Sequence, residues 1–117
     1  MLKTIMDSDK DIRFTLVSDM YGNVVTCKHR EGEGNFLTEK ETKDAIQYSA
    51  EAWRIRREHA AKIGKGKYAL VEYEKISRIT MPLSDDRLLL VTIDNNQNPL
   101  KRIELILNQV SHPKNIE

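Results

Sequence analysis

The hydrophobic positions change spacing several times along the chain, and the longest stretch with one spacing runs from Leu37 to Lys67. Apolar residues recur there every three or four positions, as they do on one side of an α-helix. Thr38 and Glu41 have the spacing of a capping box, in which the threonine hydroxyl and the glutamate carboxylate each accept a hydrogen bond from a backbone N–H. Gly64 suits the left-handed position that follows many helices. The pattern predicts one long helix that begins at Thr38, ends near Gly64 and covers a sheet.

The apolar side of this predicted helix is wider than contact with a sheet requires. Tyr48 and Ile55 extend it on one flank, where a helix that only covers a sheet usually carries polar residues. They are expected to touch a partner chain or, alternatively, to pack under the loop from His29 to Phe36. The other members of the apolar side are Ala45, Ile46, Ser49, Ala52, Trp53, Ala60 and Ile63.

Before the helix, apolar and polar residues alternate with the period of two that is typical of β-strands. One such segment runs from Ile12 to Ser18 and a second from Val24 to His29. Gly22 and Asn23 lie between them and are residue types that a tight reversal needs, so the two segments are predicted to form a hairpin. Ahead of the hairpin, a short helix with a small apolar edge is predicted from Leu2, Ile5 and Met6.

Three further strand patterns follow the long helix. Tyr68–Tyr73 and Ile76–Met81 are separated by a short reversal. Pro82 is expected to end the second of these strands, because proline has no N–H to donate. Leu88–Ile93 is the most continuously apolar strand pattern of the chain, and a strand with so few polar residues is expected in the middle of a sheet, covered on both faces.

The last regular pattern is again helical. Asn98 is a good N-cap and Pro99 a good first helical residue. The apolar stripe that follows is expected to pack on the sheet face opposite the long helix, because a strand covered on both faces needs a second layer. This stripe consists of Leu100, Ile103, Ile106, Leu107 and Val110.

Together the elements predict an α+β fold in which a single antiparallel five-stranded sheet lies between helices. Their order is (α)-β-β-α-β-β-β-α. A chain of 117 residues is large enough for one core and too small for two. Residues 1–112 are therefore expected to form a single domain, followed by a polar tail at 113–117.

Composition and charge narrow the function classes. The net charge is +1 at pH 7, so no field of the whole molecule favours nucleic acid or an anionic membrane. The single cysteine, Cys27, excludes an intramolecular disulfide. Residues 1–10 lack the apolar core of a signal peptide, and no segment approaches the length of a membrane span. A cytoplasmic protein without membrane contact is expected.

The histidines and the adjacent aspartates are the first candidates for chemistry. His29, His59 and His112 have no carboxylate or cysteine at ligand spacing, so no metal site is expected. Asp85 and Asp86 follow each other in a predicted turn. Both are expected to be solvated there, whereas acid–base catalysis needs two carboxyl groups in different environments of one cleft.

Two nucleophile types lack the partners that would activate them. Ser18 has no nucleophile elbow and no histidine placed beside it. Cys27 alternates with apolar neighbours in a strand pattern, where a small buried thiol is expected. Neither enzymatic activity nor a cofactor is therefore expected.

A run of basic residues around the end of the long helix raises the question of nucleic-acid binding. On a helix, Arg54, Arg57 and Lys62 point in different directions, and Trp53 belongs to the apolar side rather than beside the cations. A solvated helix face is the preferred interpretation, and nucleic acid is not an expected partner. The full run is Arg54, Arg56, Arg57, Lys62, Lys65 and Lys67, with Trp53 and Tyr68 nearby.

The predicted hairpin and the late apolar strand also carry a family resemblance. Phe14–Asp19 followed by Tyr21–Val25 is similar to the apolar strand, aspartate, glycine and return strand of the roadblock/dynein light chain family, and Leu88–Asp94 is similar to its late hydrophobic strand. This family has a profilin-like fold and includes bacterial and archaeal regulators of small GTPases. The chain looks similar to its small archaeal members. It departs from the family in its short N-terminal helix and in the arginines of its central helix, where the family tends to have alanine and leucine.

The resemblance implies a non-enzymatic homodimer in which the long helix and the strand after it meet their counterparts across a two-fold axis. It implies an interaction or scaffold module with a regulatory partner, a small GTPase being the candidate. A small-ligand sensor of the PAS or profilin-like type is the alternative, and it requires an interior cavity. The residues expected in the dimer interface are Tyr48, Ala52, Ile55 and His59 on the helix and Tyr68, Leu70 and Glu72 along the strand.

Overall fold

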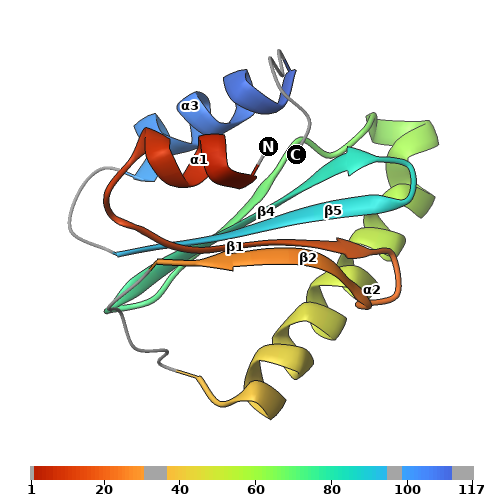
Figure 1. Ribbon diagram of the computed structural model, residues 1–117. Helices are drawn as coiled ribbons and strands as arrows, with labels where there is room; N and C mark the ends of the chain where they lie inside the picture. Colours follow the sequence, from red (N-terminus) through yellow and green to blue (C-terminus); the bar gives the residue numbers. More distant parts are fainter. Residues whose placement is uncertain (1, 31–36, 95–98, 112–117) are drawn as a thin grey trace.

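Five antiparallel strands form one sheet between two layers of helices in the computed structural model (Figure 1). The structure describes residues 2–30, 37–94 and 99–111, so the predicted N-cap Asn98 and the polar tail at 113–117 lie outside the described residues. The order of elements confirms the predicted α+β fold, including the short first helix. The elements are α1 (Leu2–Ser8), β1 (Ile12–Asp19), β2 (Val24–His29), α2 (Glu39–Ile63), β3 (Ala69–Glu72), β4 (Ile76–Ser84), β5 (Arg87–Asp94) and α3 (Pro99–Ser111).

The strand order in the sheet is β2-β1-β5-β4-β3. β5 lies at the centre, and all residues from Leu88 to Ile93 are buried. The prediction that the most apolar strand is covered on both faces is therefore confirmed. β2 and β3 form the two edges of the sheet.

Each face of the sheet has its own core, and α2 and α3 lie on opposite faces, as predicted (Figure 1). On one face, α1 and α3 pack over alternate residues of the three central strands. The core on this face contains Leu2, Ile5, Met6, Ile12, Val17, Ile79, Met81, Leu89, Val91, Ile93, Ile103 and Ile106. On the other face, α2 packs over the strand residues whose side chains point the opposite way. The buried residues on this face are Leu16, Met20, Ile46, Ala50, Trp53, Leu88 and Leu90.

The reversal between β1 and β2 is built around Asp19. Its carboxylate accepts hydrogen bonds from the side-chain amide and backbone N–H of Asn23 and from the backbone N–H of Tyr21, at 2.8 to 2.9 Å. These hydrogen bonds, that from the Asn23 side chain first, hold the pKa of Asp19 below its ordinary value. Gly22 has a positive φ of 87°, as a tight reversal requires. The predicted hairpin is confirmed.

The predicted caps of α2 are also present. Thr38 Oγ1 accepts from the Glu41 N–H at 3.1 Å, and the Glu41 carboxylate accepts from the Thr38 N–H at 3.0 Å. The second bond lowers the pKa of Glu41. At the other end, the Gly64 N–H donates to the Ala60 carbonyl at 2.8 Å. Gly64 has the expected positive φ, 91°, but its ψ of 169° is extended rather than left-handed helical. The chain therefore leaves the helix directly toward β3.

The prediction that Pro82 ends its strand is wrong. β4 continues to Ser84, and Pro82 pairs in register with Leu88 of β5. On its other side, β4 pairs with β3 only as far as Thr80, which faces Ala69. Pro82 therefore lies where β4 has a free edge, and proline is tolerated at such an edge because no donor is needed there.

Arg30 joins the short helix α1 to the hairpin, a contact that the sequence patterns do not reveal. Its Nη2 donates to the carbonyls of Met6, at 2.7 Å, and Asp9, at 2.9 Å. Its Nε donates to the carbonyl of Ile12 at 3.0 Å. A guanidinium presents several donors in one plane, so one side chain satisfies three acceptors at the point where α1 turns into β1.

No helix in the described part of the chain has the length and apolarity needed to cross a membrane.

We expect Gly22→Ala to destabilise the fold more than Gly64→Ala. Both glycines have a positive φ, which costs an alanine about 1–3 kcal/mol of unfolding free energy. A β-carbon at Gly22 would also lie 2.8 Å from Gln47 Cγ and 2.9 Å from Gln47 Cα, whereas one at Gly64 meets no atom within 4 Å. Urea unfolding measures both changes. Equal losses in the two variants would mean that the hairpin turn does not press against α2.

We expect Arg30→Met to lower the free energy of unfolding by about 1–3 kcal/mol, because it leaves partly buried carbonyls without donors. Lys43→Met on the exposed surface of α2 is the matched control, with an expected change close to zero. Denaturant unfolding of the two variants gives the comparison. A loss no greater than that of the control would show that the three carbonyl contacts do not stabilise α1.

Candidate interaction surfaces

The apolar residues of α2 form two stripes rather than the single wide side that was predicted. Ile46, Ala50 and Trp53 are buried against the sheet. Tyr48 lies two positions after Ile46, and Ile55 lies two positions after Trp53. Two positions correspond to a rotation of roughly 200° around the helix axis, so Tyr48 and Ile55 lie on the opposite face of α2. Their side chains are 74% and 47% exposed.

The predicted inward position of Ile63 is wrong as well, because its side chain is 82% exposed. A long straight helix contacts a sheet along one narrow stripe, and the rest of its circumference faces outward. The surface opposite the sheet is called the outer stripe here, and it consists of Tyr48, Ala52, Ile55 and His59.

The outer stripe brings four of the predicted interface residues together. Ala52 is half-buried and His59 is exposed. Of the loop that was the alternative cover for Tyr48 and Ile55, residues 31–36 lie outside the described residues. Of its described residues, His29 packs against Phe14 with ring centroids 4.4 Å apart, and Arg30 donates to the carbonyls of Met6, Asp9 and Ile12.

The other predicted interface residues lie along β3, an edge strand. β3 pairs with β4 on one side, and within the described residues no strand pairs with its other side. Tyr68 is 41% exposed and Glu72 is exposed, whereas Leu70 is half-buried against the core under α1 and α3. Val71, which is not among the predicted interface residues, is 49% exposed. Side chains along a strand alternate between the two faces of the sheet, so Val71 lies on the same face as Ala69, which is the face that α2 covers.

Two arginines of α2 contact hairpin turns. Arg57 is exposed, as the prediction of a solvated helix face requires, whereas Arg54 is half-buried. Arg54 donates to the Met20 carbonyl at 2.6 Å, and its guanidinium lies 5.1 Å from the centre of the Tyr21 ring. Arg57 donates to the carbonyl of Asp85 in the β4–β5 turn. The charge of the helix therefore contributes to its docking on the sheet.

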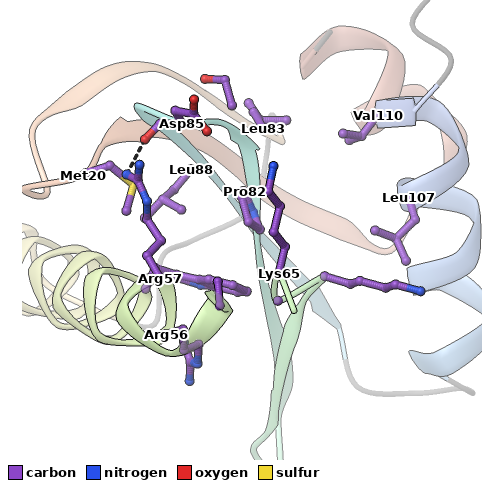
Figure 2. A pocket seen from close by; sticks show the side chains of 15 residues that line it. Met20, Arg56, Arg57, Lys65, Pro82, Leu83, Asp85, Leu88, Leu107 and Val110 are labelled. Carbon is purple, nitrogen blue, oxygen red and sulfur yellow. Dashed lines mark hydrogen bonds between the residues drawn. The ribbon is translucent and has the colours of Figure 1, made fainter. Parts of the chain in front are cut away.

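A cleft of about 720 Å³ opens where the C-terminal ends of α2 and α3 approach the β4–β5 turn (Figure 2). Arg57 extends from α2 toward Asp85 of the β4–β5 turn, and Leu107 and Val110 lie on α3 on the other side of the cleft (Figure 2). Arg56 also contributes to the lining, and its guanidinium lies over the Trp53 ring. The cleft is called the basic cleft below. Its charged lining consists of Arg56, Arg57, Lys65, Lys67 and Asp85, and its apolar lining includes Met20, Trp53, Pro82, Leu83, Leu88, Leu107 and Val110.

All four cations of the cleft belong to the basic run of the sequence, but the sequence pattern does not show that they converge. A helical projection separates Arg56 from the lysines that follow the helix, and the extended exit at Gly64 brings them to one place. Trp53 belongs to the same cleft but is 2% exposed, and its indole N–H donates to Thr80 Oγ1 at 2.8 Å.

The remaining chemical candidates have ordinary surroundings. Asp85 and Asp86 are exposed in the β4–β5 turn, as expected, and Asp86 accepts from Ser84 Oγ and Arg87. Within the described residues, no three His, Cys, Asp or Glu side chains converge as metal ligands would.

The prediction that Cys27 is buried is wrong. β2 is an edge strand, and every residue from Val24 to His29 is exposed. Alternation in a strand indicates which residues share a face, but it does not reveal whether that face is covered.

No protein-family model and no curated protein sequence matches this chain. Solved structures do match it. Gliding protein MglB from Thermus thermophilus gives a TM-score of 0.75 at 15% identity, over 95% of this chain and 80% of that chain. A roadblock/LC7 domain from Streptomyces avermitilis gives 0.67 at 9% identity, over 94% and 91%. Profilin from Schizosaccharomyces pombe gives 0.65 at 11% identity, over 95% and 91%.

These likenesses place the chain among the profilin-like α+β domains. More narrowly, it has the roadblock/LC7 fold that is also found in MglB. The resemblance seen in the hairpin and in the late strand of the sequence is confirmed at the level of the fold.

We expect Cys27 to react with a water-soluble thiol reagent in the folded protein, at a rate within about tenfold of that of the unfolded chain, because an exposed thiol is freely accessible. Absorbance after addition of dithionitrobenzoate measures the rate, and the same reaction in denaturant is the reference. Reaction that begins only on unfolding would mean that β2 is covered.

Proposed function

We propose that this protein is a non-enzymatic interaction module that forms a homodimer through the outer stripe of α2 and the free edge of β3. The observation that carries the proposal is the outer stripe itself. Tyr48 and Ile55 are large apolar side chains on the face of α2 that points away from its own core. A contiguous apolar surface of this kind on a small domain marks a surface that binds another protein.

The spacing within the outer stripe supports helix-to-helix packing. Tyr48, Ala52, Ile55 and His59 follow one another at intervals of four, three and four residues. This is the spacing with which two helices interlock along a seam, and a small residue such as Ala52 lets their backbones approach closely. A two-fold axis would place the same stripe on both sides of the contact.

The edge of β3 supports the second half of the interface. An edge strand presents unpaired N–H and C=O groups, and pairing with the same strand of a second copy would satisfy them. Val71 on the α2 side of that edge would gain cover at the same time. The proposed interface therefore combines a helix face with a strand edge.

The family resemblance supports a choice of partner to test. The roadblock family includes regulators of small GTPases, and this chain shares its fold with a bacterial member, MglB. A small GTPase is therefore the first regulatory partner to test. The single cysteine favours a reducing, cytoplasmic setting for such an encounter.

A small-ligand sensor is the second candidate, and the basic cleft is the observation that favours it. Its volume of about 720 Å³ suits a small organic molecule. The cleft opens at the surface beside the β4–β5 turn, however, whereas a sensor domain encloses its ligand between helix and sheet. The interaction module therefore has the stronger support.

We expect Ile55→Asp to weaken the dimer without unfolding the chain. A buried unpaired carboxylate in the interface should cost about 2 kcal/mol, or roughly thirtyfold in the dissociation constant. Light scattering across a dilution series, with thermal unfolding of the same samples, measures both effects.

Leu105→Asp is the matched control, since Leu105 lies on α3 and is exposed to the same extent, 47%. It should leave the dimer unchanged. If Ile55→Asp unfolds the protein, Ile55 is part of the core. If its dimer survives dilution like the wild type, the outer stripe is not the interface.

A further inference from the structure

The basic cleft concentrates positive charge in a molecule that is nearly neutral as a whole. Four cations and one carboxylate line it, whereas the whole chain carries a net charge of only +1. Lys65 and Lys67 are exposed, and within the described residues neither forms an ion pair. The cleft is therefore a local site for negative charge, which the net charge of the chain does not predict.

The two lysines are held at the cleft by the residue between them. Gly66 lies so close to the Trp53 ring that a β-carbon at this position would be 2.7 Å from Trp53 Cζ3. Trp53 in turn is anchored in the core by its hydrogen bond to Thr80. The backbone between Lys65 and Lys67 therefore rests against a buried ring, so the base of each lysine side chain has a defined place.

The cations lie on one wall of the cleft, which is formed by α2 and the segment that leaves it and which also contains the apolar side chain of Trp53. Leu107 and Val110 form a wall without cations, which belongs to α3, and Pro82 of β4 lies between the two walls (Figure 2). Leu83, next to the β4–β5 turn, adds a further apolar side chain to the lining. A ligand that fits both walls must present carboxylates on one side and alkyl groups on the other.

We propose that the basic cleft binds an acidic, amphipathic segment of a partner protein. The inference rests on the proposed interaction role and adds the chemistry of the partner and the place where it docks. A helix or extended segment with glutamate on one side and leucine on the other matches the two walls. The lining of the cleft contains no residue of the outer stripe or of β3, although Lys67 directly precedes Tyr68 of the proposed dimer interface.

Nucleic acid matches the cleft less well, although it carries negative charge. Single strands gain much of their affinity by stacking bases on exposed aromatic rings. Trp53, the aromatic side chain in the lining, is 2% exposed. The Arg56 guanidinium lies 4.8 Å from the centre of its ring, and Gly66 lies close to its six-membered ring. The apolar wall from α3 would also remain uncovered.

The test uses fluorescence anisotropy with the full chain and a labelled helical peptide of glutamate, leucine and alanine. The wild type should bind this peptide, and binding should weaken with added salt. It should be lost when glutamine replaces glutamate in the peptide, or alanine replaces leucine. Lys65→Glu with Lys67→Glu should weaken binding at least about tenfold, because reversed charges repel the peptide.

The matched control is Lys40→Glu with Lys43→Glu, which makes the same charge change on exposed positions of α2 outside the cleft. It should bind the peptide as the wild type does. Circular dichroism and light scattering on every variant show whether fold and dimer are retained.

Three results would overturn the inference. Equal loss in both double variants would mean that the peptide responds to overall charge. Binding of oligothymidylate or of laurate that depends on Lys65 and Lys67, without peptide binding, would assign the cleft to nucleic acid or to a small organic anion. If the wild type is a dimer but binds no acidic peptide, the inference about the cleft is wrong and the proposed dimer is unaffected. If the wild type binds the peptide but is a monomer, the inference about the cleft is supported and the proposed dimer is wrong.

Discussion

The contact between α2 and the sheet determines what this molecule leaves exposed. Ile46, Ala50 and Trp53 bury one stripe of a 25-residue helix, and the Trp53 indole is fixed to Thr80 at its centre. Because a straight helix contacts a sheet along one line, the opposite face of α2 is left to solvent or to another chain. The same contact positions the segment after the helix, since Gly66 packs on the Trp53 ring. Both candidate surfaces, the outer stripe and the basic cleft, therefore depend on the way this helix docks.

The arginines of α2 acquire a structural meaning from this docking. Arg54 and Arg57 donate to carbonyls in the β1–β2 and β4–β5 turns, which lie at the ends of the strands that α2 crosses. Each guanidinium satisfies a backbone acceptor in a turn and so connects that turn to α2. Arg54 and Arg57 therefore help to hold α2 on the sheet, whereas Lys65 and Lys67 after the helix are exposed and can contact a ligand.

Local sequence patterns were sufficient for the parts of the fold that depend on neighbours in the chain. The capping box at Thr38, the turn at Asp19 and the buried strand at Leu88–Ile93 all follow from short-range rules, and all are present. The errors concern what covers a residue from a distance. Cys27 is exposed because β2 is an edge, and Pro82 stays paired because β3 stops before it. The basic cleft joins α2, β4 and α3, so no local pattern could have shown it.

The central claim is that β3 and the outer stripe form the interface of a dimer, and hydrogen–deuterium exchange as a function of protein concentration tests it most directly. Backbone amides on a free sheet edge exchange rapidly, and pairing with a second strand protects them. The account predicts that exchange in Tyr68–Tyr73 slows as concentration rises through the range in which light scattering reports dimer formation. Exchange in Val24–His29, at the other edge of the sheet, should stay unchanged. A dimer that leaves Tyr68–Tyr73 unprotected, or that protects Val24–His29 instead, would contradict the account.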